Sequence, residues 1–195
     1  PKKGYAGIQR RYNSNGVVLG ENYLDATGEE DPVPAGYSTV RNTYDKKSRL
    51  ISERYYDVHR RLVTCQQGYA GVDYTYDANG NVSGKTFIGT KNQVLELPAG
   101  YARCEITSTS AGPASIRYYH ADDTPGTGES GCFEERFTYN ADGDVVLILY
   151  FDADGAPACS TDAGYGKRYE YDGNGRMIGL CYLSADQSLL AAPCG

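Results

Sequence analysis

The sequence predicts an all-β protein, an elongated or curled, solenoid-like array of six antiparallel β-hairpin repeats of about 32 residues each. Three observations predict it. Glycines recur at nearly constant spacing, aromatic and aliphatic residues recur at fixed places after each glycine, and turn sequences such as NSNG, DANG and NADG stand between them. We expect one repeat domain over residues 1–195, with repeats at 4–35, 36–67, 68–99, 100–130, 131–163 and 164–195.

Each repeat is read from its first residue onward. The opening glycines, five of which precede a tyrosine, are Gly4, Gly36, Gly68, Gly100, Gly131 and Gly164. A first anchor column follows at Tyr12, Tyr44, Tyr76, Ser108, Tyr139 and Tyr171. An aliphatic column follows at Val18, Leu50, Val82, Ala114, Val145 and Met177. A second aromatic column follows at Tyr23, Tyr55, Phe87, Tyr119, Tyr150 and Tyr182.

The turn between the anchor and the aliphatic column predicts a hairpin. In a three-residue hairpin loop, glycine is favoured at the left-handed position because it has no Cβ to clash. Ser48 stands where five repeats have glycine, which predicts local strain. A second turn after the second aromatic column leads to a short third strand, such as 94–97, so we expect about eighteen strands.

Alternation along the strands assigns their two faces. The face of the aliphatic column is expected to be the inner one. The second aromatic column lies on the other face beside charges such as Glu53, Lys85 and Arg117, which predicts a partly wetted ladder. DVVLILYFD, residues 144–152, is apolar on both faces and is expected to be covered on both sides.

Composition excludes several function classes. The formal charge of −6 and the pI near 4.9 disfavour nucleic acid, which needs a basic patch. No apolar run approaches the roughly 20 residues of a membrane span, so we expect no membrane insertion. Six cysteines allow 15 connectivities. Extracellular disulfides and buried free thiols both fit this count, and Cys181 with Cys194, which flank the last predicted hairpin, are a possible pair.

Catalytic and metal sites are not indicated. Loops such as DANGN place glycine fourth, whereas a calcium-binding EF-hand loop needs glycine sixth, so these loops are interpreted as turns. His120 lies beside Asp122 and Asp123 without a marked nucleophile, which is typical of a surface histidine. We therefore expect no enzyme activity, no metal and no cofactor.

Several motifs resemble known repeats. YTYDANGN, residues 74–81, resembles the YD repeats of the RHS family, which build β-hairpin shells in bacterial secreted and surface proteins. YFDADGAPA, residues 150–158, is similar to an element of cell-wall-binding and glucan-binding repeats. Residues 164–183 look like tandem Tyr-rich repeats of surface proteins from gut Firmicutes. These resemblances imply a hairpin array at a bacterial cell surface or outside the cell.

The leading hypothesis is a non-catalytic repeat domain that binds cell-wall polysaccharide, another carbohydrate or a surface protein. Its contact ladder would be the second aromatic column, since tyrosine rings stack on sugars and bury protein partners. Alternatively, these rings only stack on one another. The rival hypotheses are a structural spacer without a ligand and a fragment of an RHS-like toxin-delivery shell.

Overall fold

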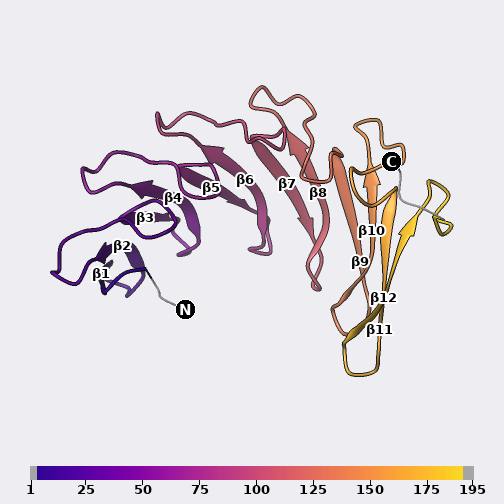
Figure 1. Ribbon diagram of the computed structural model, residues 1–195, viewed down its shortest axis with the longest axis horizontal. Coiled ribbons are helices and arrows are strands. Elements are labelled where there is room, and N and C mark those ends of the chain that lie inside the picture. The colour runs from indigo at the N-terminus through magenta and orange to yellow at the C-terminus, as the bar shows by residue number, and fades with distance from the viewer. Residues whose placement is uncertain (1–3, 191–195) are drawn as a thin grey trace. The chain divides into compact units, whose positions relative to one another are not determined.

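The computed structural model describes residues 4–190 and confirms the all-β class. Twelve antiparallel strands are hydrogen-bonded in chain order (Figure 1). They are β1 (Gly7–Tyr12), β2 (Val18–Leu24), β3 (Thr39–Tyr44), β4 (Leu50–Tyr56), β5 (Gly71–Tyr76), β6 (Val82–Ile88), β7 (Arg103–Ser108), β8 (Pro113–Tyr119), β9 (Glu134–Tyr139), β10 (Val145–Phe151), β11 (Gly166–Tyr171) and β12 (Met177–Leu183). Among the described residues, no helix is long and apolar enough to cross a membrane.

The chain divides into two compact units, which are described separately. The N-terminal unit holds Pro1–Thr75 and Lys85–Leu97. The C-terminal unit holds Tyr76–Gly84 and Pro98–Gly195. The same hairpin recurs in both units.

The hairpin turn forms as the sequence predicts. In the second hairpin, the N–H of Ser48 donates to the carbonyl of Asp45 at 3.0 Å, and Ser48 has a φ of 61° in the left-handed region. The Asp45 carboxylate accepts the N–H groups of Lys47 and Arg49 at 2.8 and 2.9 Å. These bonds lower the pKa of Asp45, the Arg49 N–H most strongly. The acidic residue at the start of the turn therefore closes the backbone loop.

The prediction of a third strand in each repeat is wrong, because the described residues form twelve strands instead of about eighteen. After the second turn of the third hairpin, only Val94 forms a bridge with Ile88, and the N–H of Leu95 donates to Phe87 at 2.9 Å. The chain then leaves the sheet because the turn that opens the next repeat follows almost at once. The equivalent segments of the other hairpins likewise form single bridges within the part of the chain that the structure describes.

The fourth repeat is one residue out of the predicted alignment. Its turn is shorter, closed by the N–H of Thr109 to the carbonyl of Gly112 at 2.7 Å, and Ser108 pairs with Pro113. As a result Tyr118, rather than Tyr119, occupies the place of Tyr55 in the second hairpin. Likewise Pro113, and not Ala114, occupies the aliphatic-column position of this repeat.

The sixth repeat also opens one residue earlier than predicted. The N–H of Ser160 donates to the carbonyl of Gly164 at 2.8 Å, as that of Val33 donates to Tyr37 at 2.9 Å. Ala163, not Gly164, therefore stands at the opening-glycine position.

The two faces of the sheet are the reverse of the prediction. In the N-terminal unit, a buried cluster is formed by Val40, Tyr55 and Cys65, with Tyr37 and Tyr69 packed against it. All lie on or over the face of the second aromatic column, because the turns that open each repeat fold onto this face. The strand β10, expected to be covered on both sides, is half-buried except for Tyr150, which is 4% exposed.

Candidate functional site

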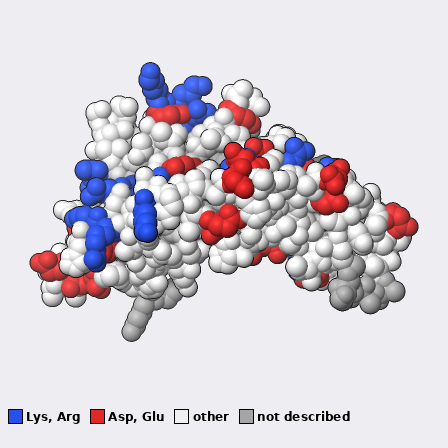
Figure 2. All heavy atoms as spheres, turned by 90° about the horizontal axis from the view of Figure 1, so that it is seen from above, with Lys and Arg blue, Asp and Glu red and all other residues white. Residues whose placement is uncertain are grey.

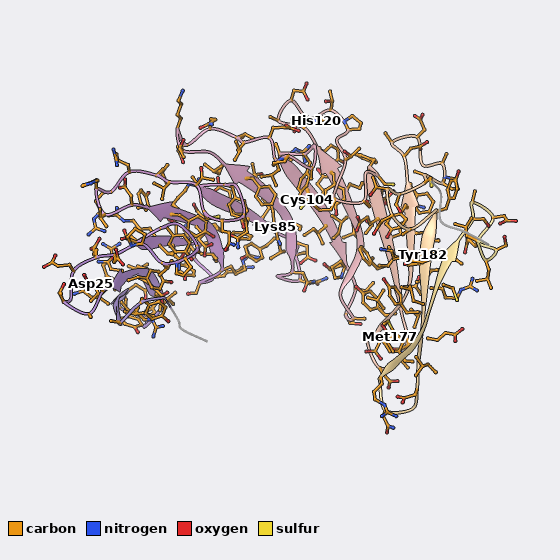
Figure 3. All side chains as sticks on the ribbon, viewed as in Figure 1. Asp25, Lys85, Cys104, His120, Met177 and Tyr182 are labelled. Carbon is orange, nitrogen blue, oxygen red and sulfur yellow. The ribbon has the colours of Figure 1, made fainter. Side chains whose placement is uncertain are left out.

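The second aromatic column does not form a wetted ladder. Tyr55 and Phe87 are each 8% exposed, and Tyr150 is buried. Tyr23 and Tyr182 are half-buried, the latter on β12 (Figure 3). Tyr119 lies on the opposite face, where its hydroxyl donates to Glu105 at 3.1 Å. Ligand binding by this column stays a prediction, but its buried rings do not present a stacking surface to solvent.

Six rings of the N-terminal unit instead pack in one series, which we call the ring ladder. Its members are Tyr5, Tyr23, Tyr37, Tyr55, Tyr69 and Phe87, with successive centroids 5.2, 5.9, 4.6, 6.1 and 5.0 Å apart. Rings from the second aromatic column alternate with the tyrosines that follow the opening glycines. Each inner ring therefore packs between one ring of its own repeat and one ring of a neighbouring repeat.

Two hydroxyl groups of the ring ladder are bonded to carboxylates of the chain itself. Tyr23 donates to the Glu21 carboxylate at 2.9 Å, and Tyr55 donates to Glu53 in the same manner. Burial, and then the hydrogen bond to Glu53, raise the pKa of Tyr55. Neither hydroxyl is left over for a ligand.

The opposite face of the sheet carries polar grooves in both units. Each lies between two neighbouring hairpins and is closed at one end by the second turn of the later hairpin. The first groove, in the N-terminal unit, has a volume of about 410 Å³. It is lined by Gln9, Arg10, Arg11, Gly20, Asn22, Thr39, Val40, Arg41 and Arg60.

The first groove has an excess of positive charge. Arg60 donates to Thr39 at 2.7 Å and pairs with Glu30 at 2.5 Å. The Arg41 guanidinium lies 4.9 Å from the centroid of the Tyr56 ring. Within the described residues, Arg11 and Arg41 make no ion pair. Two guanidinium groups thus face the groove without a carboxylate.

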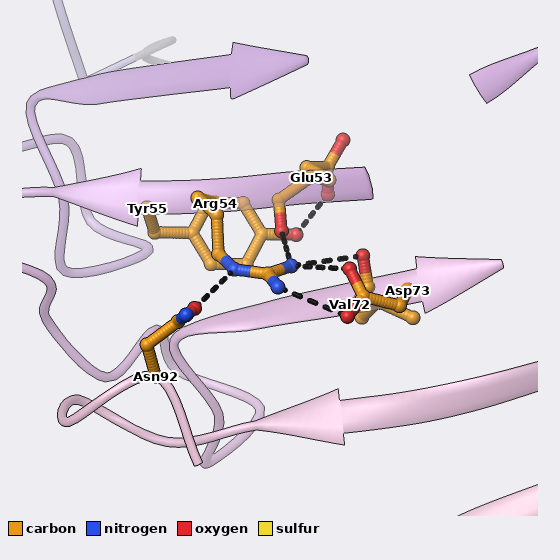
Figure 4. Close-up of polar contacts among 6 residues, drawn as sticks. All are labelled: Glu53, Arg54, Tyr55, Val72, Asp73 and Asn92. Carbon is orange, nitrogen blue, oxygen red and sulfur yellow. Dashed lines mark hydrogen bonds and ion pairs between the residues drawn. The ribbon is translucent and has the colours of Figure 1, made fainter. Parts of the chain in front are cut away.

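Between the second and third hairpins of the N-terminal unit, the corresponding place holds an ion pair of the chain's own side chains (Figure 4). Arg54 makes a bidentate pair with Asp73, at 2.7 and 3.0 Å, and its Nε donates to Asn92 at 3.1 Å. Gly71 allows this arrangement, because a Cβ there would collide with the Arg54 side chain and the Glu53 carbonyl. The positive charge of Arg54 is thus balanced by Asp73 at this place.

A groove of the C-terminal unit, of about 360 Å³, holds a carboxylate of the chain itself. Glu134 is 3% exposed and lies between Arg117, at 3.2 Å, and Arg136, at 2.8 Å. Burial alone would raise the pKa of Glu134, but the hydrogen bond and charge of Arg136, with Arg117, hold it below its ordinary value. Tyr119 also lines this groove, beside Phe133. We call it the Glu134 groove.

Charge is divided unevenly between the units. The N-terminal unit has 13 Lys and Arg against 10 Asp and Glu, a net +3, and the C-terminal unit has 6 against 15, a net −9. On the face seen in Figure 2, most Lys and Arg accordingly lie over the N-terminal unit. No signal in the repeat columns alone points to this division.

The remaining predicted site residues are placed as follows. Cys181 is half-buried in β12, whereas Cys194 lies outside the described residues, so their pairing stays a prediction. His120 lies in the second turn of the fourth repeat (Figure 3). In residues 4–190, no three His, Cys, Asp or Glu side chains are grouped as a metal site would require.

No family model and no curated protein matches this sequence. Solved structures with a similar strand arrangement include a Photorhabdus luminescens Tc holotoxin pore, at 13% identity and a TM-score of 0.40 over 93% of this chain. Two structures of TcdB2-TccC3 are similar at 12% and 16% identity, with TM-scores of 0.38 and 0.37 over 91% and 90% of this chain. The chain spans 9%, 10% and 9% of those three proteins, respectively. At these scores the likeness carries no argument about function.

Proposed function

We propose that this chain is a non-catalytic structural repeat segment, a spacer or scaffold, of a bacterial surface or secreted protein. The ring ladder supports this proposal most directly. Its rings pack against one another within and between repeats of the same chain. The hydroxyl groups of Tyr23 and Tyr55 donate to carboxylates of their own repeats. Units that contact mainly their neighbours form arrays whose stability grows with each interface, which suits a segment that spans a distance.

Carbohydrate binding through the second aromatic column is the rival proposal, and it keeps one structural observation in its favour. Tyr119 is partly accessible and lines the Glu134 groove beside Phe133, with ring centroids 5.3 Å apart. Ligand sites are commonly lined by aromatic side chains together with a few polar or charged groups that fix the orientation of the ligand.

A glycan and cell-wall-polysaccharide array, read with Tyr55→Ala and Tyr119→Ala, separates the two proposals. The scaffold proposal expects no bound glycan that depends on either residue, and a loss of stability in Tyr55→Ala because its ring is buried. A glycan signal that disappears in Tyr119→Ala, with unchanged thermal unfolding, would establish binding and reject the scaffold as the whole function.

The location outside the cell belongs to the same proposal. A disulfide between Cys181 and Cys194 would fit an oxidising compartment. Thiol titration of unreduced, denatured protein measures it, and six reactive thiols would contradict the pairing. An RHS-like shell fragment, suggested by the motif at 74–81, is the remaining alternative. Protease shaving of intact cells tests surface exposure directly.

A further inference from the structure

We propose that the first groove, on the face of β1–β3 opposite the ring ladder, is a docking site for an acidic peptide segment. A Glu or Asp side chain of that segment would place its carboxylate against Arg41 and Arg11. This inference goes beyond a scaffold function and does not depend on it.

The first groove and the Glu134 groove are equivalent sites of the repeat. Thr39 begins β3 opposite Asn22 of β2, and Glu134 begins β9 opposite Arg117 of β8. Two residues later in each strand comes an arginine, Arg41 or Arg136, opposite Gly20 or Ser115. Both arginines lie over an aromatic ring that ends the following strand, Tyr56 for the first and Phe151 for the second. The repeat therefore holds the guanidinium in a similar position in both grooves.

The two grooves differ in what meets that guanidinium. In the Glu134 groove, one carboxylate oxygen lies 2.8 Å from Arg136 and the other 3.2 Å from Arg117. In the first groove, Thr39 stands where Glu134 stands and has no carboxylate to offer. Arg41 therefore makes no ion pair with any of residues 4–190. The Glu134 groove thus shows that a glutamate side chain fits at the equivalent place of the repeat. In the first groove, a carboxylate of another molecule can occupy that place.

The rest of the first groove suits a peptide. Gly20 projects no side chain into the groove, and a Cβ there would lie only 2.8 Å from the carbonyl oxygen of Val40. Asn22 donates its amide N–H to Gln9 Oε1 at 3.5 Å and accepts from the Thr39 hydroxyl at 3.2 Å. The side-chain NH2 group of Gln9, which also lines the groove, can donate to a peptide carbonyl. The volume of about 410 Å³ lies within the usual range for ligand sites, roughly 300–1,000 Å³. A guanidinium pairs well with a carboxylate because its N–H groups match both oxygens.

Fluorescence anisotropy of labelled hexaglutamate with the whole chain tests the proposal. We expect hexaglutamate to bind, a peptide of equal length made of Gly and Gln not to bind, and 0.5 M salt to weaken binding because exposed pairs are screened. Arg11→Gln and Arg41→Gln should each weaken binding about threefold, and the double variant about tenfold, as expected for exposed ion pairs. Thr39→Glu should abolish binding, since the new carboxylate would fill the groove as Glu134 does.

Arg61→Gln is the matched control. It removes the same charge beside Arg60, but Arg61 pairs with Asp57 within its own turn and does not line the groove. Far-UV circular dichroism and thermal unfolding show whether each variant is folded. If Arg61→Gln weakened binding as much as the groove variants, the proposal would be overturned, because net charge alone would then explain the binding.

Two further measurements can also overturn it. Tighter binding of trigalacturonate than of hexaglutamate would assign the groove to an acidic saccharide. A concentration-dependent dimer in analytical ultracentrifugation, dissolved by Arg41→Gln, would assign it to a second copy of this chain. Monomeric protein that prefers hexaglutamate supports the acidic peptide.

Discussion

The two units build the same hairpins around different cores. In the N-terminal unit, six rings form the ring ladder. In the C-terminal unit, the place of the opening tyrosine is taken by Cys132 in the fifth repeat and by Gly164 in the sixth. There the buried cluster is Cys132, Tyr150 and Ala163, with Ile148 and Tyr182 packed against it.

This difference shows that ring stacking does not set the strand register. The same bulged pairing recurs at Tyr44 with Leu50 and at Tyr139 with Val145, one in each unit. The turns and their hydrogen bonds impose that register, and the core then adapts to what the side chains supply. The core residues should therefore differ in energetic weight between the units, while the turns should not.

The largest effect is expected from removing a ring of the ladder. Tyr55→Ala should lower the free energy of unfolding by about 3–4 kcal/mol, because a buried ring and its neighbours' packing are lost. Tyr182→Ala, at the equivalent place in the C-terminal unit, should cost about 1–2 kcal/mol, since this ring is half-buried. Urea unfolding of the two variants measures the difference. Equal losses would mean that both cores depend on their rings to the same extent.

The Glu134 groove should matter next. Glu134→Gln should lower stability at pH 7 by about 1–3 kcal/mol, because Arg117 and Arg136 lose their buried carboxylate partner. The pKa of Glu134 is lowered in the folded protein, so its contribution is present above the unfolded pKa of about 4.3 and is lost as pH falls through the lower folded pKa. The difference between wild type and variant should therefore shrink below about pH 4 in urea unfolding.

Within the C-terminal unit, the fourth repeat should open more readily than the fifth. Pro113 stands opposite Ser108 at the base of its hairpin and has no N–H to donate, whereas the fifth repeat pairs Tyr139 with Val145. Amide hydrogens of residues 108–130 should exchange about tenfold faster than those of 139–161. Hydrogen exchange with mass spectrometry compares the two segments in one sample. Slower exchange in the fourth repeat would show that other contacts replace its missing anchor.

The smallest effect should come from the turns. Ser48→Gly should stabilise the protein by about 0.5–1 kcal/mol, because serine is strained at a φ of 61° and glycine is not. The reverse change, Gly80→Ser at a φ of 92°, should destabilise it by a similar amount. Thermal unfolding of both variants provides the comparison. If Ser48→Gly were destabilised, the higher conformational entropy that glycine gives the unfolded chain would outweigh the strain that it relieves.

Local features of the fold could be predicted from the sequence. The all-β class, the repeat and the hairpin turns follow from short-range rules, in which glycine position and side-chain alternation act within one repeat. The same rule places Ser48 at a left-handed position, and its φ of 61° agrees with this. The shorter turn at 109–112 was missed, because a glycine-centred alignment hides the loss of one residue when the flanking columns still hold similar residues.

Tertiary structure alone decided which face became the core and where the grooves lie. Both faces of the strands carry aromatic and aliphatic side chains, so alternation separates them without saying which is covered. The covering segments are the opening turns, whose tyrosines pack against rings of the preceding repeat. The first groove likewise depends on residues from three strands and the turn at Arg60, which come together only through register. The sequence alone determined the local hairpin. Contacts between hairpins determined which face of the sheet is buried and which is exposed, because burial depends on what packs against a face.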